Sequence, residues 1–268
     1  MEPVGMFAIE DLTVSHGHET VLHRISVTIP ERQFTVLLGP NGSGKSTLIS
    51  AMAGVIPVRG GRVRLAGRPL AELSRRELAR QIAFLPQQLH TPMGMSVRDL
   101  VVQGRFPWRG WMRGWSARDE DAVARAVALC RIGALMERPL DSLSGGQLQR
   151  VWIAMTLAQD TPVILLDEPT TFLDVESQLD LLDLLARLRD DGRTVIAILH
   201  DLNQAARYAD RLILLKDGRV AAQGETATTF VPANIDPVFS IHARMVTDPE
   251  TEGMICVPTA LERRDCDA

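Results

Sequence analysis

Nine consecutive residues near the start of the chain have the composition of a phosphate-binding loop. They fit the pattern G-x-x-x-x-G-K-[ST] and are Gly39, Pro40, Asn41, Gly42, Ser43, Gly44, Lys45, Ser46 and Thr47. Glycine lets the backbone approach a phosphate closely, and the N–H groups at the start of a following helix favour an anion. We therefore expect a triphosphate here, with Lys45 reaching its β- and γ-phosphates and the Ser46 hydroxyl ligating Mg²⁺.

Two carboxylates follow a short apolar run later in the chain. The run 163–166 predicts a buried strand, and Asp167 and Glu168 come directly after it. Open α/β sheets bind ligands at the carboxyl ends of their strands, where the loop 39–47 would also lie. We expect Asp167 to hold Mg²⁺ through water, opposite Ser46, and Glu168 to polarise the attacking water. An apolar run ending in Asp-Glu is by itself often only a strand that meets solvent, but the phosphate-binding loop in the same chain favours the functional interpretation.

A second candidate anion site precedes another predicted helix. The segment 143–147 reads Leu-Ser-Gly-Gly-Gln, and its last four residues are Ser144, Gly145, Gly146 and Gln147. Ser144 can cap the helix, and the two glycines leave its first N–H groups exposed to an anion. Because the chain has one phosphate-binding loop, this second site is predicted to contact a nucleotide held by another copy of the protein. Ser-Gly-Gly alone is a common loop, whereas the whole pentapeptide before a helix is much rarer.

The elements that must position these residues indicate an α/β fold. Residues 6–36 alternate as antiparallel strands do, and from about 88 to 161 the strand signal gives way to helices with capping boxes at Ser96 and Ser116. Near-continuous apolar strands that alternate with helices then indicate a parallel sheet covered on both faces. The predicted strands are 7–14, 21–29, 34–38, 62–66, 82–86, 163–166, 194–199 and 211–215. The predicted helices are 47–53, 74–80, 96–104, 116–131, 148–155, 175–190 and 202–208. The last 30 or so residues have no pattern regular enough to assign.

Composition excludes several classes of protein. A net charge of −4 and a pI near 5.9 argue against a nucleic-acid binder that relies on a basic surface. Cys130, Cys256 and Cys266 are widely spaced, which favours reduced thiols in a cytosolic chain over a disulfide framework or a zinc site. Neither a signal peptide nor an apolar run of roughly 18 residues is found, so any membrane role must depend on a partner.

The loop 105–115 contains three tryptophans, Trp108, Trp111 and Trp115. Two interpretations stay open. The rings could pack beneath the loop, or they could form a surface that faces a partner, because aromatic residues and arginine are enriched at interfaces.

The segments 39–47, 143–147 and 163–168, in that order and spacing, resemble the ATP-binding cassette (ABC) family, whose own signature is Leu-Ser-Gly-Gly-Gln. The resemblance covers nearly the whole chain. It implies a P-loop NTPase core with a RecA-like parallel sheet, an N-terminal antiparallel β subdomain and an inserted α-helical subdomain. The implied boundaries are 1–235 for the ATP-binding domain, with the helical subdomain at about 88–161, and 236–268 for a C-terminal extension.

The family resemblance also assigns roles to individual residues. It implies a head-to-tail homodimer that encloses two ATP molecules, each between the P-loop of one copy and Ser144–Gln147 of the other. Gln87 matches the glutamine that contacts Mg²⁺ and water and couples to the permease. Asp174, in the segment 171–174, matches the loop at the dimer seam, and His200 matches the histidine that contacts the γ-phosphate. His16 stands where the family usually stacks a tyrosine on adenine, and its imidazole offers less stacking area than a phenol ring, so this adenine contact is open.

Further segments narrow the resemblance to the ATPases of iron–siderophore importers, of the ferric-citrate and ferric-enterobactin type. These segments are 85–88, 96–101, 104–108 and 200–208, with 238–243 and 256–258 in the tail. The importers of haem and vitamin B12 share much of this pattern. The resemblance implies a peripheral subunit at the cytoplasmic face of the inner membrane, bound to permease subunits. It also implies an indirect link to a periplasmic or lipid-anchored substrate-binding protein, and no nucleic acid.

Two other classes of function fit the sequence less well. A soluble cassette ATPase that acts on DNA or ribosomes would carry long coiled-coil insertions or two cassettes in one chain, and neither is present. A general P-loop ATPase or kinase that does not dimerise as a cassette would have no use for the segment 143–147. The sequence therefore favours a transport ATPase.

Overall fold

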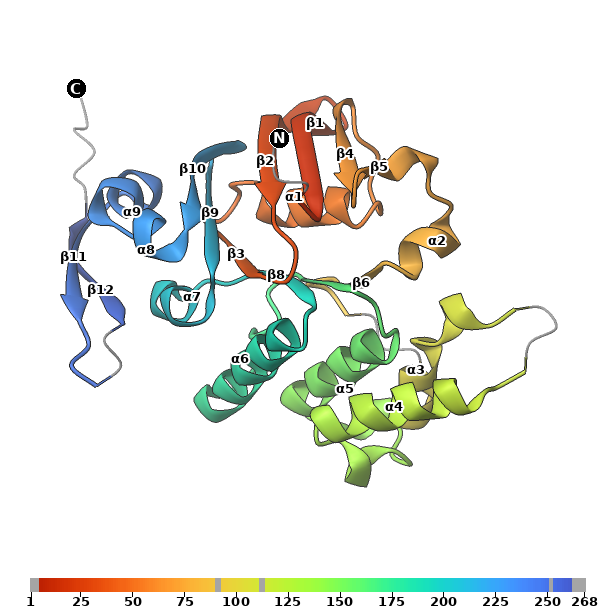
Figure 1. Cartoon of the computed structure of the whole chain (residues 1–268). Helices are drawn as coiled ribbons and strands as arrows, with labels where there is room; N and C mark the ends of the chain where they lie inside the picture. The colour runs from red at the N-terminus through yellow and green to blue at the C-terminus, as the bar shows by residue number, and fades with distance from the viewer. Residues whose placement is uncertain (1–4, 90–92, 111–113, 251–252, 262–268) are drawn as a thin grey trace.

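The computed structural model describes residues 5–89, 93–110, 114–250 and 253–261. A six-stranded sheet forms its centre, in the order β10-β9-β3-β8-β7-β6 (Figure 1). Its strands are β3 (Phe34–Leu38), β6 (Ile82–Leu85), β7 (Val163–Leu166), β8 (Thr194–Ile198), β9 (Arg211–Lys216) and β10 (Arg219–Glu225). The five strands from β9 to β6 are parallel, and β10 closes one edge as the antiparallel arm of a hairpin. The predicted parallel sheet is confirmed.

The central strands are apolar on both faces because each face covers a different core. Successive residues of a strand point to opposite faces, so alternate residues join different clusters. One cluster contains Val36, Leu166 and Ala197 together with the large helices. The other contains Leu37, Leu165 and Ile196 together with the N-terminal sheet.

The N-terminal sheet and one helix cover the second face. This sheet has the order β2-β1-β4-β5 and is antiparallel, with strands β1 (Phe7–His16), β2 (Glu19–Ile29), β4 (Gly60–Leu65) and β5 (Arg68–Pro69). Helix α1 (Lys45–Met52) packs between the two sheets (Figure 1). The helix was predicted to start at residue 47 but begins at Lys45.

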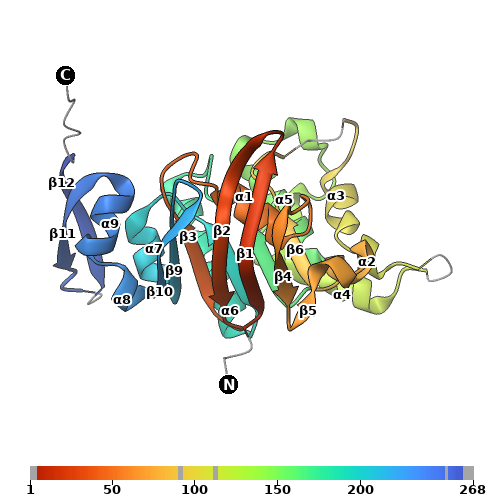
Figure 2. The same ribbon diagram turned by 90° about the horizontal axis from the view of Figure 1, so that it is seen from above.

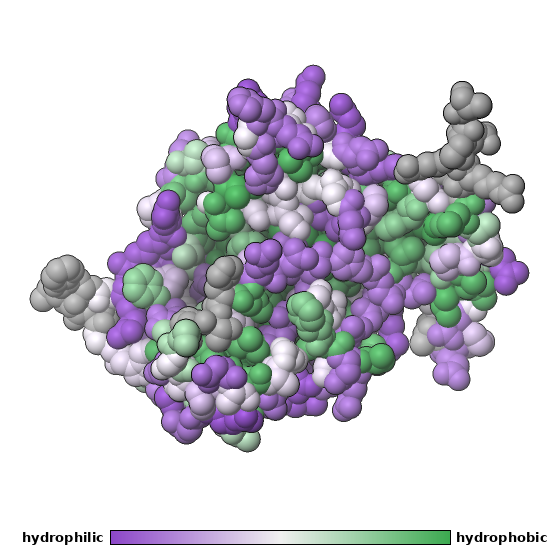
Figure 3. Space-filling model, turned by 180° about the vertical axis from the view of Figure 1, so that it is seen from behind, coloured by the Kyte–Doolittle hydropathy of each residue, from purple (hydrophilic) through white to green (hydrophobic). Residues whose placement is uncertain are grey.

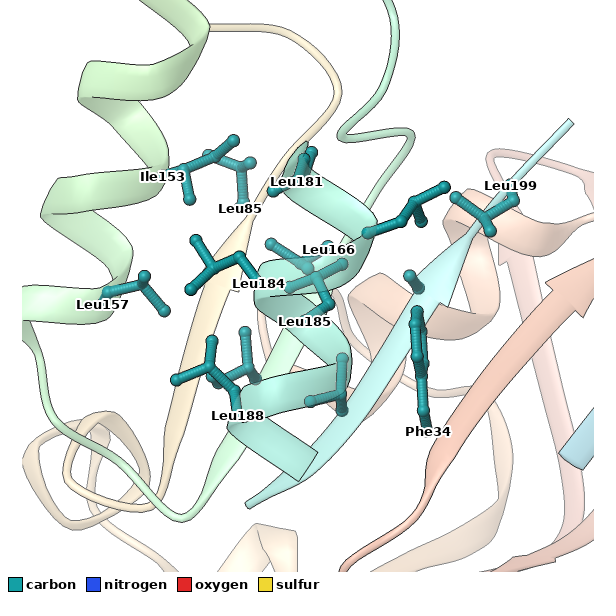
Figure 4. Packing of buried hydrophobic residues seen from close by; sticks show 14 of the residues in the cluster. Phe34, Leu85, Ile153, Leu157, Leu166, Leu181, Leu184, Leu185, Leu188 and Leu199 are labelled. Atoms are coloured by element: carbon teal, nitrogen blue, oxygen red, sulfur yellow. The ribbon is translucent and has the colours of Figure 1, made fainter. Parts of the chain in front are cut away.

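Helices cover the first face of the central sheet. Helix α5 (Gly145–Ala158) and helix α6 (Val175–Asp190) pack side by side there through Ile153, Leu157, Leu181, Leu184 and Leu188 (Figure 4). Helices α3 (Val97–Gln103) and α4 (Ala117–Leu129) pack on α5, and the short α2 (Arg75–Ala79) lies before β6. The described residues between 70 and 142 also contain four short 3₁₀ helices: Leu70–Glu72, Phe106–Trp108, Gly133–Leu135 and Leu140–Ser142.

Serine caps begin four of these helices. Ser74, Ser96, Ser116 and Ser144 each accept the N–H of the residue three positions later, whose side chain reaches back to the serine N–H. These capping boxes are the local signals that made the helix starts readable from the sequence.

The tail forms regular structure that the sequence pattern did not predict. After α7 (Leu202–Tyr208), the chain adds α8 (Thr226–Thr229), α9 (Pro232–Phe239) and a hairpin of β11 (Ile241–Thr247) with β12 (Met254–Leu261). Figure 2 shows α9 and this hairpin together at one side of the molecule. β12 lies against α7 and β11 against α9.

One ring of the tryptophan loop packs beneath it, and the partner-facing interpretation stays a prediction. The Trp108 indole N–H donates to the Gln159 carbonyl at 2.6 Å, and three arginine side chains lie over its ring, so this residue packs beneath the loop. The side chain of Trp115 is 40% exposed and donates to Glu120. Trp111 lies outside the described residues.

On the face shown in Figure 3, hydrophobic residues lie in separate patches among hydrophilic ones. Within the described ranges, every helix is too short or too polar to cross a bilayer.

Candidate nucleotide-binding site

The loop 39–47 joins the central strand β3 to helix α1, as the sequence predicts. Gly39, Gly42 and Gly44 have φ angles of 151°, 78° and 97°. At Gly39 a Cβ atom would lie 2.1 Å from the Leu215 carbonyl oxygen, so a larger residue cannot fit. Gly44 caps α1 without a side chain, which leaves the first N–H groups of the helix available to an anion.

Lys45 is folded onto the loop that contains it. Its side chain is buried, and Nζ donates to the carbonyl oxygens of Gly39 at 2.8 Å and Pro40 at 2.9 Å. Burial lowers the pKa of Lys45, while Glu168 and Asp167 act in the opposite direction. The Ser43 hydroxyl is also buried and has no hydrogen-bond partner among the described residues. A buried hydroxyl normally has a hydrogen-bond partner, and a phosphate oxygen could accept from both Ser43 and Lys45.

Asp167 faces α1 from the end of β7. Ser46 Oγ donates to its Oδ1 at 3.0 Å, and the carboxyl group is 4% exposed. Desolvation, with the nearby charge of Glu168, raises the pKa of Asp167 to about 6, against the lowering effect of the Ser46 hydrogen bond. A buried carboxylate beside a hydroxyl offers the hard oxygen ligands that Mg²⁺ prefers, and a cation there would favour its charged form.

Polar residues that follow three neighbouring strands lie close together at one edge of the sheet. Gln87 follows β6, Glu168 follows β7 and His200 follows β8, and these strands are adjacent in the sheet. Glu168 Oε2 accepts from Gln87 Nε2 at 2.7 Å, and its Oε1 lies 2.7 Å from His200 Nε2. Glu168 itself has φ of +52°, a backbone conformation that is strained for this residue type and turns its side chain into the cluster.

These residues line one hollow of about 370 Å³, within the range of small-molecule sites. Its wall consists of Val21, Asn41, Gly42, Ser43, Gly44, Lys45, Ser46, Thr47, Gln87, Glu168 and His200. Val21 of β2 was not predicted, because an apolar residue in a strand does not by itself indicate contact with a ligand.

The other predicted residues do not line this hollow. His16 ends β1, is exposed and pairs with Glu19 across the turn. The segment Ser144–Gln147 begins α5, and Gly145 lines a separate hollow with Phe172. Asp174 caps α6 by accepting the Ser177 N–H at 2.7 Å. The structure thus assembles the P-loop with Asp167, Glu168, Gln87 and His200, whereas the segment predicted as a second anion site lies elsewhere.

Comparisons with known proteins agree with this geometry. A family model described as ABC transporter matches residues 22–171. The achromobactin transport ATP-binding protein CbrD of Dickeya dadantii is 43% identical over 254 residues, covering 94% of each chain. The ferric enterobactin transport ATP-binding protein FepC of Escherichia coli is 41% identical, covering 96% of this chain and 95% of its own. The hemin import ATP-binding protein HmuV of Streptomyces coelicolor is 39% identical, covering 92% and 88%.

Solved structures give the same result. A structure described as that of a metal-chelate type ABC transporter in an inward-facing conformation matches with a TM-score of 0.81 and 26% identity, covering 96% of this chain and 98% of that one. The dimeric bacterial ABC transporter cassette MJ0796 matches with a TM-score of 0.74 and 29% identity, covering 82% and 99%. The chain therefore belongs to the family of ATPases that power ABC transporters.

Proposed function

We propose that this ATPase couples ATP binding and hydrolysis to the uptake of an iron(III)–siderophore-type chelate through a membrane permease. The ATP-hydrolysis step of this proposal is supported by one observation, the cluster of Gln87, Glu168 and His200 beside the P-loop. The substrate class is supported by relatives named for achromobactin and ferric enterobactin, which align with this chain over nearly its full length.

The P-loop binds the phosphates of ATP. The free N–H groups at the start of α1 and the Ser43 hydroxyl would donate to phosphate oxygens, and Lys45 would exchange two carbonyl oxygens for the β- and γ-phosphates. The carbonyl contacts keep the buried ammonium group satisfied until the nucleotide arrives.

Three residues would hold Mg²⁺ with the nucleotide. Ser46 Oγ and Asp167 Oδ1 lie 3.0 Å apart, and Gln87 lines the same hollow as Ser46. A cation held by these residues would offset the negative charge of the phosphates.

Glu168 is the proposed general base, and Gln87 and His200 hold it between them. Its two carboxylate oxygens are each engaged by one of these neighbours. When the γ-phosphate and the attacking water are present, Gln87 and His200 have new partners there, and Glu168 is freed to take a proton from the water.

A second copy of the chain would complete each site. Ser144, Gly145, Gly146 and Gln147 lie outside the hollow of their own chain, yet the capped start of α5 offers N–H groups to an anion. A head-to-tail homodimer would bring this segment to the ATP of the opposite copy, with Asp174 near the seam. The dimeric MJ0796 cassette supports this arrangement. His16 would face the adenine.

The remaining assignments follow from the transport role. The ATPase would sit at the cytoplasmic face of the inner membrane on permease subunits, with a periplasmic or lipid-anchored protein that delivers substrate. Residues 1–235 would form the ATP-binding domain, with a helical subdomain at about 88–161, and 236–268 would form an extension.

Haem is the second candidate substrate, because HmuV aligns at 39% identity. Reconstitution of the ATPase with its permease in proteoliposomes separates the two substrates. We expect ATP-driven uptake of a radio-iron siderophore chelate and none of haem. Haem uptake alone would replace the first candidate with the second, and the absence of ATP-driven uptake of either would reject both.

A further inference from the structure

Helix α7 sets the position of His200 because it begins two residues later. It has only seven residues, and the Asp201 carboxylate caps it by accepting the N–H groups of Asn203 and Gln204 at 2.7 Å and 2.9 Å. An isolated helix of this length is not stable in water, so contacts with the rest of the molecule must hold it in place.

One side of α7 is tied to the segment that follows Glu168. Gln204 Nε2 donates to Gln178 Oε1 at 2.9 Å. Gln178 Nε2 in turn donates to the carbonyl oxygens of Leu173 at 3.1 Å and Thr170 at 3.4 Å. The start of α7 is thereby linked to the loop between β7 and α6.

The other side of α7 is tied to the C-terminal hairpin by Asn203. Its Oδ1 accepts the Cys256 N–H at 2.7 Å, and its Nδ2 donates to the Cys256 carbonyl at 3.4 Å. The side-chain amide thus pairs with strand β12 as a neighbouring strand would. Cys256 is 3% exposed and belongs to the same core as Ala205 of α7, so the anchor point is fixed.

His200 needs such support because little else holds its ring. Its side chain is 47% exposed, and its polar side-chain contact within the described residues is with Glu168. The direction of the imidazole therefore depends on the backbone from which it extends, and that backbone continues directly into the α7 cap.

We propose that Asn203 is a positioning residue for His200, with the β11–β12 hairpin as the anchor through which it acts. The inference rests on the proposed role of His200 at the γ-phosphate. It gives the C-terminal strands a function in ATP hydrolysis although they lie outside the nucleotide-binding hollow.

The test compares full-length variants in a steady-state ATPase assay. Asn203→Leu removes both hydrogen bonds at similar size, and we expect kcat to fall roughly tenfold while KM for ATP changes less than about twofold. Asn203→Asp keeps the acceptor for the Cys256 N–H and should retain kcat within about twofold. Asn234→Leu is the matched control, because it removes a side-chain bond to the Thr229 carbonyl, a bond in the C-terminal part that involves neither α7 nor β12.

A double-mutant cycle distinguishes an effect on the position of His200 from a general loss of stability. If Asn203 acts through His200, Asn203→Leu causes no further loss of the residual turnover of His200→Ala. Hydrogen exchange of α7 amides should be faster in Asn203→Leu than in the unaltered chain or in Asn234→Leu.

Each alternative result has a distinct meaning. Normal kcat for Asn203→Leu, an equal loss from Asn234→Leu, or an undiminished loss in the His200→Ala background would overturn the inference and leave the proposed function intact. Full turnover of His200→Ala itself would instead reject the proposed role of His200, and the inference with it.

Discussion

Glu168 and His200 lie 2.7 Å apart, Oε1 to Nε2, although they follow different strands of the sheet. The second carboxylate oxygen of Glu168 accepts from Gln87 at the same distance. Both oxygens of the proposed base are therefore engaged, and one must be released before it can accept a proton from water. Gln87 and His200 hold Glu168 here, and they are also the residues that would contact the γ-phosphate and the water. Nucleotide binding and the release of Glu168 are therefore linked.

Replacing Glu168 by Gln should separate binding from hydrolysis. Glutamine keeps the size of the side chain and one of its two acceptor oxygens, but it cannot take a proton from water. We expect ATP binding to persist, phosphate release to fall by at least about a hundredfold, and the ATP-bound dimer to accumulate in size-exclusion chromatography. Near-normal hydrolysis by this variant would reject Glu168 as the base.

The two lysines of the chain provide a matched pair for testing the P-loop. Lys45→Ala should weaken ATP binding by about ten- to a hundredfold, because it removes charge-assisted hydrogen bonds to phosphate. Lys216→Ala is the control, since Lys216 ends β9 and donates to the Pro237 carbonyl, away from the hollow. Calorimetry measures both affinities, and equal values for the two variants would remove Lys45 from the phosphate site.

Arg105 and Asp119 form a buried ion pair that should stabilise the helical part of the fold. Their side chains are 2% and 7% exposed, with Nε to Oδ1 at 2.9 Å, and Arg105 also donates to the Ala158 carbonyl. Arg105→Ala leaves a buried carboxylate without its partner, so we expect a loss of about 3–5 kcal/mol in the free energy of unfolding. Arg98→Ala breaks the exposed pair with Glu137, which water screens, so its loss of stability should be much smaller. Urea unfolding measures the loss of stability in both variants. Similar losses would mean that burial does not increase the contribution of the Arg105–Asp119 pair to stability.

This ion pair shows what the sequence could not predict. Arg105 lies in a Gly- and Trp-rich loop where an arginine normally faces solvent, and its partners Asp119 and Ala158 come from two separate helices. Ser96 and Ser116, by contrast, marked helix starts correctly because a capping box involves only four consecutive residues.

The Cys130 thiol should add a pH-dependent contribution to stability at alkaline pH. Burial raises its pKa from 9.0 to about 12. Below pH 9 the thiol is protonated in both the folded and the unfolded chain. Between pH 9 and 12 only the unfolded chain releases the proton, so the free energy of unfolding falls as the pH rises.

Comparison with Cys130→Ala isolates this contribution. Between pH 8 and pH 10 the unaltered chain should lose about 1.4 kcal/mol more stability in urea unfolding than the variant. Equal losses would mean that the thiol already ionises in the folded chain.

Most residues that line the candidate nucleotide-binding hollow were predictable from the sequence, but the contacts between them were not. Strand ends in a parallel sheet meet at one edge, so Asp167, Glu168 and the P-loop could be placed together from apolar runs alone. The hydrogen bonds that join Gln87, Glu168 and His200 depend on side-chain directions that no spacing encodes. The β11–β12 hairpin was not predicted because the alternation of β11 covers only a short run, 241–245, and β12 has no regular alternation.

A mixing experiment tests whether two copies share each ATP site. Lys45→Ala disables the P-loop of one chain. Ser144→Asp keeps an oxygen to cap α5 but places a negative charge where the phosphates of the opposite copy would lie. Each variant alone forms homodimers in which both sites carry the defect, so neither should hydrolyse ATP well. In a mixed dimer one site combines both defects, and the other combines an intact P-loop with an intact Ser144 segment. Random pairing makes half of the dimers mixed, each with one working site, so an equal mixture should recover about a quarter of normal turnover. If each chain used its own Ser144 segment, no pairing could rebuild a site, and the mixture would stay as inactive as its components.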